Sequence, residues 1–510
     1  LPLWLIMAPI RPSQSDTFAY FLPNATYLVD YGRFPTAFLP PSASALPAAP
    51  YNGLFLTFLG SLADGGFPAS GLSLINVLLL LTAGMALARA IPWPPVRAEE
   101  APSWPLMALG FLLATLLNPG FVPRIDFAGW AETALAVTAL FAAWLFVVGQ
   151  GELGAGARPK LPVALCLVLA AMVNAKQSGI GLVLALAGAA VIAGWAERGM
   201  PRQALIRYTA VALVPALLLY GLWRYYASYA GVAELTPLPW DEWHWAILPE
   251  TLRSIGRIVS EKPVYFGGVA IAILALPPML RRFGWIPTTR LLALHAAAFV
   301  LYNGYLMAAY IAHFSGEMSA EAHSYFRYNT HLSLVLVLAL ALTARDLAAG
   351  RELFARIRRP VGAALVILAV LVPIGFAYRL RFDLVMPQPL VWNLAQNAKP
   401  YLKDGDRLAL LLPGDNGSVA DMLSGILTEV APRRRLELLR RQTADDAAFA
   451  EAAQLGYPLA LVSCTGAAEN AAALLEHDGE GWHRRAVWPY PPEARAQRWQ
   501  HILSWPALCR

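Results

Sequence analysis

Charged residues are scarce in this chain. They make up 14% of its 510 residues, and hydrophobic residues make up 57%, whereas soluble domains carry about 25% charged residues. This composition excludes a large soluble core and predicts an integral membrane protein. The formal net charge of +6 comes from arginines in a few loops, as expected for a membrane protein. It needs no nucleic-acid partner to explain it.

Motifs for common cofactors are absent as well. The sequence holds neither the phosphate-binding pattern GxxxxGK[ST] nor the zinc pattern HExxH. Energy for a reaction must then come from an activated substrate or from a gradient. A secondary transporter would show inverted repeats with charges at the membrane midplane. We see no internal repeat, and the ionisable residues gather at one face instead.

Cysteine is rare, with three residues in the chain. Cys166 lies in a predicted span, whereas Cys464 and Cys509 lie in the C-terminal region. An oxidising compartment would allow a disulfide between these two, and two unpaired buried thiols are the alternative. No initiator Met or signal peptide is visible, so we expect residues upstream of position 1.

Apolar runs predict about eleven transmembrane helices, since a span needs about 20 residues. Residues 1–10 would end the first. The others cover residues 69–91, 103–117, 127–148, 161–173, 179–195, 205–222, 264–280, 291–311, 326–342 and 361–380. Arginines gather at every second connection, and the positive-inside rule places those loops in the cytoplasm. The intervening loops would then face the periplasm of a bacterial inner membrane.

Two domains are predicted. Residues 1–382 form a transmembrane domain with surface segments at about 11–65, in which 18–31 is an amphipathic helix and 51–63 a surface or re-entrant helix. Residues 383–510 regain charge and alternating patterns, which predict a small periplasmic α/β domain. Its expected elements are strands at 407–412 and 458–463 and helices at 418–430 and 467–475.

Two aspartates on the periplasmic side are candidate catalytic groups. Asp16 follows the first apolar run, where a carboxylate is costly unless it is used; the alternative is that it caps the following helix. Asp126 precedes a span, and its alternative is N-capping together with an ion pair to Arg124. Glu132 would lie inside that span and face the same cavity.

Cationic and aromatic residues on the same side are candidates for binding a phosphate. Lys176 lies at the tip of a short hairpin, and Arg327 begins a span beside Tyr325. Both suit a phosphate at headgroup depth, and snorkelling to the interface is the alternative. Arg224 has the same character with less support. His323 could act as a base or as a plain hydrogen-bonding residue.

The order of these pieces resembles the GT-C class of polyprenol-dependent glycosyltransferases, such as the protein O-mannosyltransferases and the lipid A aminoarabinose transferases. The matching pieces are Ser15-Asp16 with Tyr20, a Pro-rich stretch before a surface helix, Asp126, Lys176 in its hairpin, and Tyr325-Phe326-Arg327-Tyr328. The resemblance covers roughly residues 1–380. It implies a polyprenyl-phosphate sugar donor, inversion at the sugar and Asp16 as general base. It also implies that Lys176 and Arg327 bind the donor phosphate.

The sequence therefore predicts an α-helical polytopic glycosyltransferase of the GT-C type in the bacterial inner membrane. It would transfer a sugar from a polyprenyl-phosphate donor to a periplasmic glycan, lipid or protein acceptor, among membrane lipids. No cofactor is implied with certainty, and a divalent cation stays open. The alternatives are a polysaccharide polymerase or ligase that uses a diphosphate-linked lipid, and a lipid-sugar transporter or flippase.

Overall fold

The chain folds as two compact units in the computed structural model. The helical unit comprises Leu1–Ala8, Tyr27–Pro41 and Leu46–Ala377, and the C-terminal unit comprises Pro9–Thr26, Ser42–Ala45 and Tyr378–Arg510. The structure describes residues 1–39, 42–49, 56, 59, 70–92, 100–232, 236–348, 359–385, 388–413, 415, 417–430, 436–463 and 471–489. Residues 9–26, expected as a surface segment of the transmembrane domain, thus pack within the C-terminal unit.

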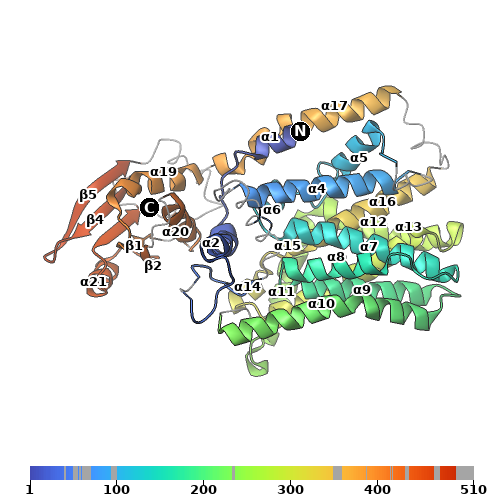
Figure 1. The fold of residues 1–510 in the computed structure, drawn as a ribbon, viewed down its shortest axis with the longest axis horizontal. Helices are drawn as coiled ribbons and strands as arrows, with labels where there is room; N and C mark the ends of the chain where they lie inside the picture. Colours follow the sequence, from blue (N-terminus) through green and yellow to red (C-terminus); the bar gives the residue numbers. More distant parts are fainter. Residues whose placement is uncertain are drawn as a thin grey trace. The chain divides into compact units, whose positions relative to one another are not determined.

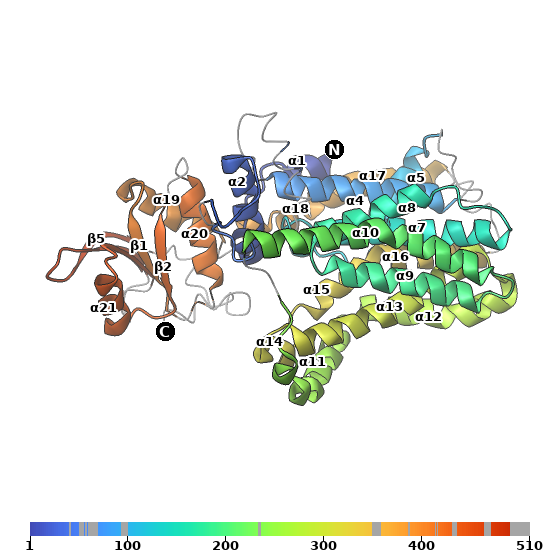
Figure 2. The same ribbon diagram turned by 60° about the horizontal axis from the view of Figure 1, so that its bottom comes forward.

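Long apolar helices make up the helical unit, where they lie side by side (Figures 1 and 2). Seven segments of the described chain are long and apolar enough to cross a membrane. They are α4 (Gly71–Ala90), α7 (Glu132–Gly154), α9 (Gly179–Ala196), α10 (Arg202–Ala230), α12 (Pro263–Phe283), α13 (Pro287–Ala312), and Tyr325–Leu347, formed by α15 (Tyr325–Asn329), η4 (Thr330–Leu332) and α16 (Ser333–Leu347).

Shorter helices fall on the remaining predicted spans. These are α1 (Pro2–Met7), α5 (Trp104–Ala114), α8 (Pro162–Ala175) and α17 (Arg359–Gly375). The expectation of a multi-pass helical membrane protein is therefore confirmed, while the count of about eleven spans stays a prediction.

Small residues let neighbouring helices approach closely. A Cβ atom on Gly110 of α5 would lie 2.1 Å from the carbonyl oxygen of Gly84 in α4, and one on Gly181 of α9 would lie 2.3 Å from the ring of Tyr305 in α13. Van der Waals packing of this kind drives helix association where lipid removes the hydrophobic driving force. These glycines therefore set the spacing of two helix pairs.

An ion pair and a hydrogen bond to a backbone carbonyl join helix ends on the side of the basic loops. Arg290 at the start of α13 donates two hydrogen bonds to Glu197, which follows α9, at 2.6 and 2.9 Å. Arg345 at the end of α16 pairs with Asp346 at 2.7 Å and donates to the carbonyl oxygen of Ile91 at 3.2 Å. The Arg290–Glu197 ion pair and the bond from Arg345 to Ile91 thus join residues that lie far apart in sequence.

The aromatic segment after residue 222 is helical, which corrects the prediction of a loop. The helix α10 continues to Ala230 and ends where Gly231 adopts φ +61°. The indole N–H of Trp223 donates to the carbonyl oxygen of Ala48 at 2.6 Å. The hydroxyl of Tyr226 donates to the carbonyl oxygen of Pro35. These side-chain bonds hold the extra turns, so Arg224 lies on a helix.

Short elements connect the spans. The amphipathic helix expected at 18–31 is present as η1 (Thr17–Phe21) and α2 (Leu22–Tyr31). The helix expected at 51–63 lies outside the described residues, apart from two exposed leucines. The remaining α-helices of this unit are α6 (Pro123–Asp126), α11 (Leu248–Glu261) and α14 (Gly316–Ala320). The helix α18 (Ala377–Leu380) begins at the last residue of this unit and continues into the C-terminal unit.

A five-stranded sheet forms the core of the C-terminal unit, in the order β2-β1-β3-β4-β5. Its strands are β1 (Arg407–Leu411), β2 (Glu437–Arg441), β3 (Leu459–Ser463), β4 (Ala471–His477) and β5 (Trp482–Pro489), and its helices are α19 (Gln388–Ala398), α20 (Ser418–Val430) and α21 (Asp446–Gln454). Strands β2, β1 and β3 run parallel, and β4 and β5 add antiparallel pairs. The expected small α/β domain is confirmed.

One predicted element of this domain is wrong. Residues 467–475 were expected to form a helix, and alanine and leucine favour helices, but residues 471–475, the part of this range that the structure describes, belong to β4, which pairs with β3 on one side and β5 on the other. Its first five residues are buried. Burial between two strands outweighs the local helix preference, as is common for strand residues. The disulfide or thiols expected at Cys464 and Cys509 lie outside the described residues.

Candidate functional site

Two of the predicted cations meet at one buried carboxylate in the helical unit. Glu132 is the first residue of α7, and its side chain is 2% exposed. Its Oε1 atom lies 2.7 Å from Nζ of Lys176, which follows the end of α8, and 3.3 Å from Nε of Arg327 in α15. Three segments that are far apart in sequence therefore converge here.

The cluster of Glu132, Lys176 and Arg327 carries more positive than negative charge. One carboxylate faces one ammonium and one guanidinium, which leaves an excess of one positive charge. A carboxylate at this depth is tolerated because it is paired. The two cations keep part of their surface accessible, with side-chain exposures of 23% for Lys176 and 17% for Arg327. The cluster is thus suited to receive an anion.

Aromatic rings line the two cations. The guanidinium of Arg327 lies 4.6 Å from the ring centre of Trp130, and Nζ of Lys176 lies 5.1 Å from that of Tyr328. Cation–π contacts of this kind hold a cation without neutralising it. The rings therefore orient both side chains and leave their charge available.

The turn before α15 is strained. Ala322 and Ser324 have φ values of +50° and +61°, and they are the non-glycine residues with positive φ in the described part of the chain. Residues other than glycine enter this region at a cost. Such strain clusters at functional sites, where the surrounding structure maintains it. Here it fixes the start of the helix that carries Arg327.

Three polar atoms near the cluster lack a hydrogen-bond partner among the described residues. They are Oε2 of Glu132, Nε1 of Trp130 and Nε2 of His331, all buried. His331 also shares a 2.7 Å hydrogen bond between its Nδ1 and the hydroxyl of Tyr302. Buried polar atoms are normally paired, so an unpaired donor and acceptor beside two cations indicate a place for a polar ligand.

Trp130, Tyr302 and His331 were not expected from the sequence. Tyr302 and His331 lie within apolar runs that we interpreted as plain spans. An ionisable residue inside a span is a functional candidate by default, and this signal could have identified His331. Trp130 carries no comparable signal, because interfacial tryptophans are common.

Asp126 has the geometry of a turn cap. Its Oδ2 accepts a 2.7 Å hydrogen bond from the backbone of Val122, and the hydroxyl of Thr133 lies 3.4 Å from its Oδ1. The side chain is buried, with the residue 7% exposed, and burial raises the pKa of Asp126 to about 7. Arg124 is exposed, and among the described residues it forms no ion pair with Asp126. The capping alternative is thus present, and a catalytic role for Asp126 stays a prediction.

The other donor-binding candidates of this unit lie around the same turn or on α10. Tyr325 is buried and stacks on Phe266 with ring centres 6.1 Å apart. His323 is exposed, and its carbonyl oxygen accepts a 2.8 Å bond from the hydroxyl of Tyr310. Burial, together with the charge of Arg224, lowers the pKa of His313 at the end of α13. Arg224 therefore lies near that helix end.

Asp16 and Tyr20 belong to the C-terminal unit. Asp16 is the N-cap residue of η1, and it is half-buried. The carbonyl oxygen of Tyr20 accepts a 3.2 Å hydrogen bond from the hydroxyl of Ser44. Burial raises the pKa of Asp421 in α20, and the negative charge of Asp16 adds to this rise, whereas the positive charge of Arg440 lowers the pKa. Asp16 therefore lies beside α20.

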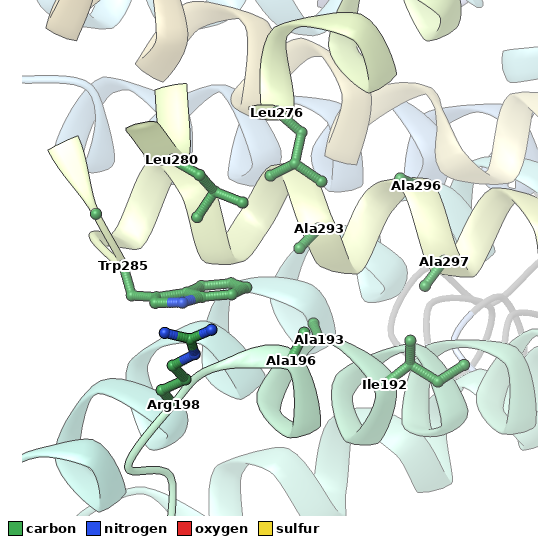
Figure 3. A pocket seen from close by; sticks show the side chains of 11 residues that line it. Ile192, Ala193, Ala196, Arg198, Leu276, Leu280, Trp285, Ala293, Ala296 and Ala297 are labelled. Carbon is green, nitrogen blue, oxygen red and sulfur yellow. The ribbon is translucent and has the colours of Figure 1, made fainter. Parts of the chain in front are cut away.

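A separate cavity of about 610 Å³ lies between α9, α12 and α13 (Figure 3). Alanine and leucine side chains form most of its wall, and Arg198 points toward the ring of Trp285. It lies at the C-terminal end of α9, whereas Lys176 precedes the N-terminal end. No acid or histidine lines it, so it offers no acid–base chemistry. Among the described residues no group of His, Cys, Asp or Glu is placed to hold a metal ion.

Comparisons with known proteins identify a similar fold. No family model and no curated protein sequence matches the chain. Among solved structures it is similar to ArnT from Cupriavidus metallidurans bound to undecaprenyl phosphate, with 14% identity over 90% of this chain and 91% of ArnT and a TM-score of 0.49. The apo form of ArnT gives 16% identity over 90% of both chains and a TM-score of 0.45.

ArnT is a lipid A aminoarabinose transferase of the GT-C class. At such identity and TM-score the likeness concerns the fold, and the roles of individual residues have to be argued from the side chains of this chain.

Proposed function

We propose that the chain is a membrane glycosyltransferase that uses a polyprenyl-phosphate sugar donor. The observation that carries this proposal is the convergence of Lys176 and Arg327 on Glu132, with one positive charge in excess. A lipid phosphate is an anion that matches this charge. The unpaired Oε2 of Glu132 would accept a hydrogen bond from a sugar hydroxyl.

The reaction would proceed as a single displacement. Asp16 takes the proton of an acceptor hydroxyl, as the family resemblance implies, and the acceptor oxygen bonds to the anomeric carbon with inversion. The bond between that carbon and the phosphate oxygen breaks, and its electron pair leaves with undecaprenyl phosphate. The phosphate gains one negative charge in this step. Lys176 and Arg327 would therefore stabilise the transition state more than the bound donor, which is what catalysis requires.

A transfer assay tests this proposal. Purified protein in nanodiscs is supplied with undecaprenyl-phosphate-linked 4-amino-4-deoxyarabinose, mannose or glucose and an extracted envelope fraction that contains acceptors. Release of undecaprenyl phosphate is measured. We expect release from at least one donor, loss of release in Asp16→Asn, and wild-type release in Glu480→Gln, a change in an exposed turn of the C-terminal unit. Full activity in Asp16→Asn would remove Asp16 from the mechanism.

We also propose that the cluster and the C-terminal unit face the periplasm. This follows from the arginines at every second connection, which the positive-inside rule places in the cytoplasm. Reporter fusions at residues 155 and 320 test the orientation. We expect the first in the cytoplasm and the second in the periplasm, and the same compartment for both would contradict the proposed topology.

A further inference from the structure

A short segment before Asp16 is bound by the first residues of the C-terminal region. The guanidinium of Arg381 donates to both oxygens of Asp383 at 2.8 Å, and its Nη2 also donates to the carbonyl oxygen of Pro9 at 3.4 Å. The Asp383 side chain is fully buried, and its Oδ2 accepts a 3.3 Å bond from the backbone N–H of Arg11. This ion pair therefore fixes the chain where it enters the segment.

The first two turns of α19 bind the next two residues, Pro12 and Ser13. The amide of Gln388 donates to the carbonyl oxygen of Ser13 at 3.1 Å, and the indole of Trp392 donates to that of Pro12 at 3.2 Å. The guanidinium of Arg11 lies 5.3 Å from the ring centre of Trp392. Carbonyls without a helical or strand partner are thus satisfied from residues more than 370 positions away.

The helix α20 holds the residues that follow Asp16. Phe18 is 3% exposed, and its ring packs directly on Gly425. A Cβ atom on Gly425 would lie 2.3 Å from Cδ1 of Phe18, a distance that real contacts do not reach. Gly425 is the residue that permits this approach, because any side chain there would displace the ring. Asp16 lies two residues before Phe18 in the chain.

We infer that the C-terminal unit is the positioning element for Asp16, with Gln388 and Trp392 of α19 fixing the residues before it and Gly425 of α20 seating Phe18 after it. This inference rests on the proposed function, in which Asp16 is the general base. A base must lie within hydrogen-bond reach of its proton, and a displacement of about 1 Å can cost up to 100-fold in rate. Gln388, Trp392 and Gly425 are then positioning residues of a sugar transferase.

The variant Gly425→Ala tests the inference in the full-length protein. We expect kcat for release of undecaprenyl phosphate to fall by about 10-fold, while KM for the lipid donor changes less than about 2-fold, because the cations that bind its phosphate belong to the other unit. Hydrogen exchange of peptides covering residues 9–26 should become faster. The control is Gly481→Ala, where the added Cβ meets nothing closer than 4.0 Å, and it should match the wild type in both measurements.

A second substitution separates positioning from a general loss of structure. In the background Phe18→Val the ring is gone, so adding Gly425→Ala should cost less than about 2-fold, a non-additivity typical of residues in contact. Should Gly425→Ala fail to fold, Gln388→Met is used instead, and we expect it to lower kcat while KM for the lipid donor stays nearly unchanged. Loss of activity in Asp16→Asn together with unchanged kcat and exchange in Gly425→Ala would overturn the positioning role alone. Retained activity in Asp16→Asn would remove Asp16 from the mechanism and the catalytic meaning of the inference with it, whereas the absence of release by the wild type from every donor would contradict the proposed function itself.

Discussion

Removing the carboxylate of Glu132 should destabilise the protein and strengthen its response to a lipid phosphate. Nζ of Lys176 and Nε of Arg327 contact the same oxygen at 2.7 and 3.3 Å, so they lie within about 6 Å of each other. At an effective dielectric constant of about 20, two unit charges at that distance repel by about 3 kcal/mol. The variant Glu132→Gln leaves this repulsion without its counter-charge, and breaking a buried ion pair costs about 3–5 kcal/mol.

A bound phosphate would restore the missing negative charge. Thermal unfolding of the purified protein is measured with and without undecaprenyl phosphate, in the wild type, in Glu132→Gln and in Glu321→Gln. The last variant changes an exposed glutamate in the turn before α15 and serves as the control. We expect Glu132→Gln to have a lower Tm without lipid and a larger rise in Tm with lipid than the other two proteins. An equal or smaller rise would refute the reasoning, because the cations would then not face the phosphate.

Three further predictions follow from the described contacts. Lys176→Met should weaken binding of undecaprenyl phosphate by about 10-fold, which corresponds to the loss of about one charge-assisted hydrogen bond. The control Arg198→Gln, at the far end of α9, should bind like the wild type, and equal affinities of the two variants would remove Lys176 from the site. Asp126→Asn should flatten the dependence of Tm on pH, because burial raises the pKa of Asp126 to about 7. The stability that its bound proton contributes is full below about pH 4 and is lost as the pH rises through 7. An unchanged pH profile in the variant would contradict this. Gly110→Ala should reduce the free energy of unfolding in denaturant by about 1–3 kcal/mol through overpacking. The control Gly221→Ala, whose added Cβ meets nothing within 4 Å, should leave that free energy unchanged. Similar effects of the two variants would argue against close packing of α4 on α5.

Most of the helical unit could be predicted because spans are encoded locally. An apolar run of the right length identifies a helix without knowledge of its neighbours, and α4, α9 and α13 lie within a few residues of their predicted ranges. Where other contacts decide, the prediction was wrong. The side-chain bonds of Trp223 and Tyr226 extend α10, and strand pairing turns the alanine-rich segment of β4 into a strand.

The site could be predicted in part. Lys176 and Arg327 stand out because a cation at a membrane boundary calls for an anion, and the structure brings both to Glu132. His331 and Tyr302 were missed because their bond to each other depends on how two spans pack. The hydrogen bonds between residues 11–13 and residues 383–392 could not be predicted. They join residues more than 370 positions apart, and no local sequence pattern records such pairs.

The central claim is that the cluster of Glu132, Lys176 and Arg327 holds the phosphate of a polyprenyl lipid. Its most direct test is the affinity of the protein in nanodiscs for undecaprenyl phosphate compared with undecaprenol, which has the same chain and no phosphate. We predict that the wild type prefers the phosphate by about 100-fold, or about 3 kcal/mol, and that the double variant Lys176→Met/Arg327→Gln binds both lipids equally. Equal binding of the two lipids by the wild type would contradict the account.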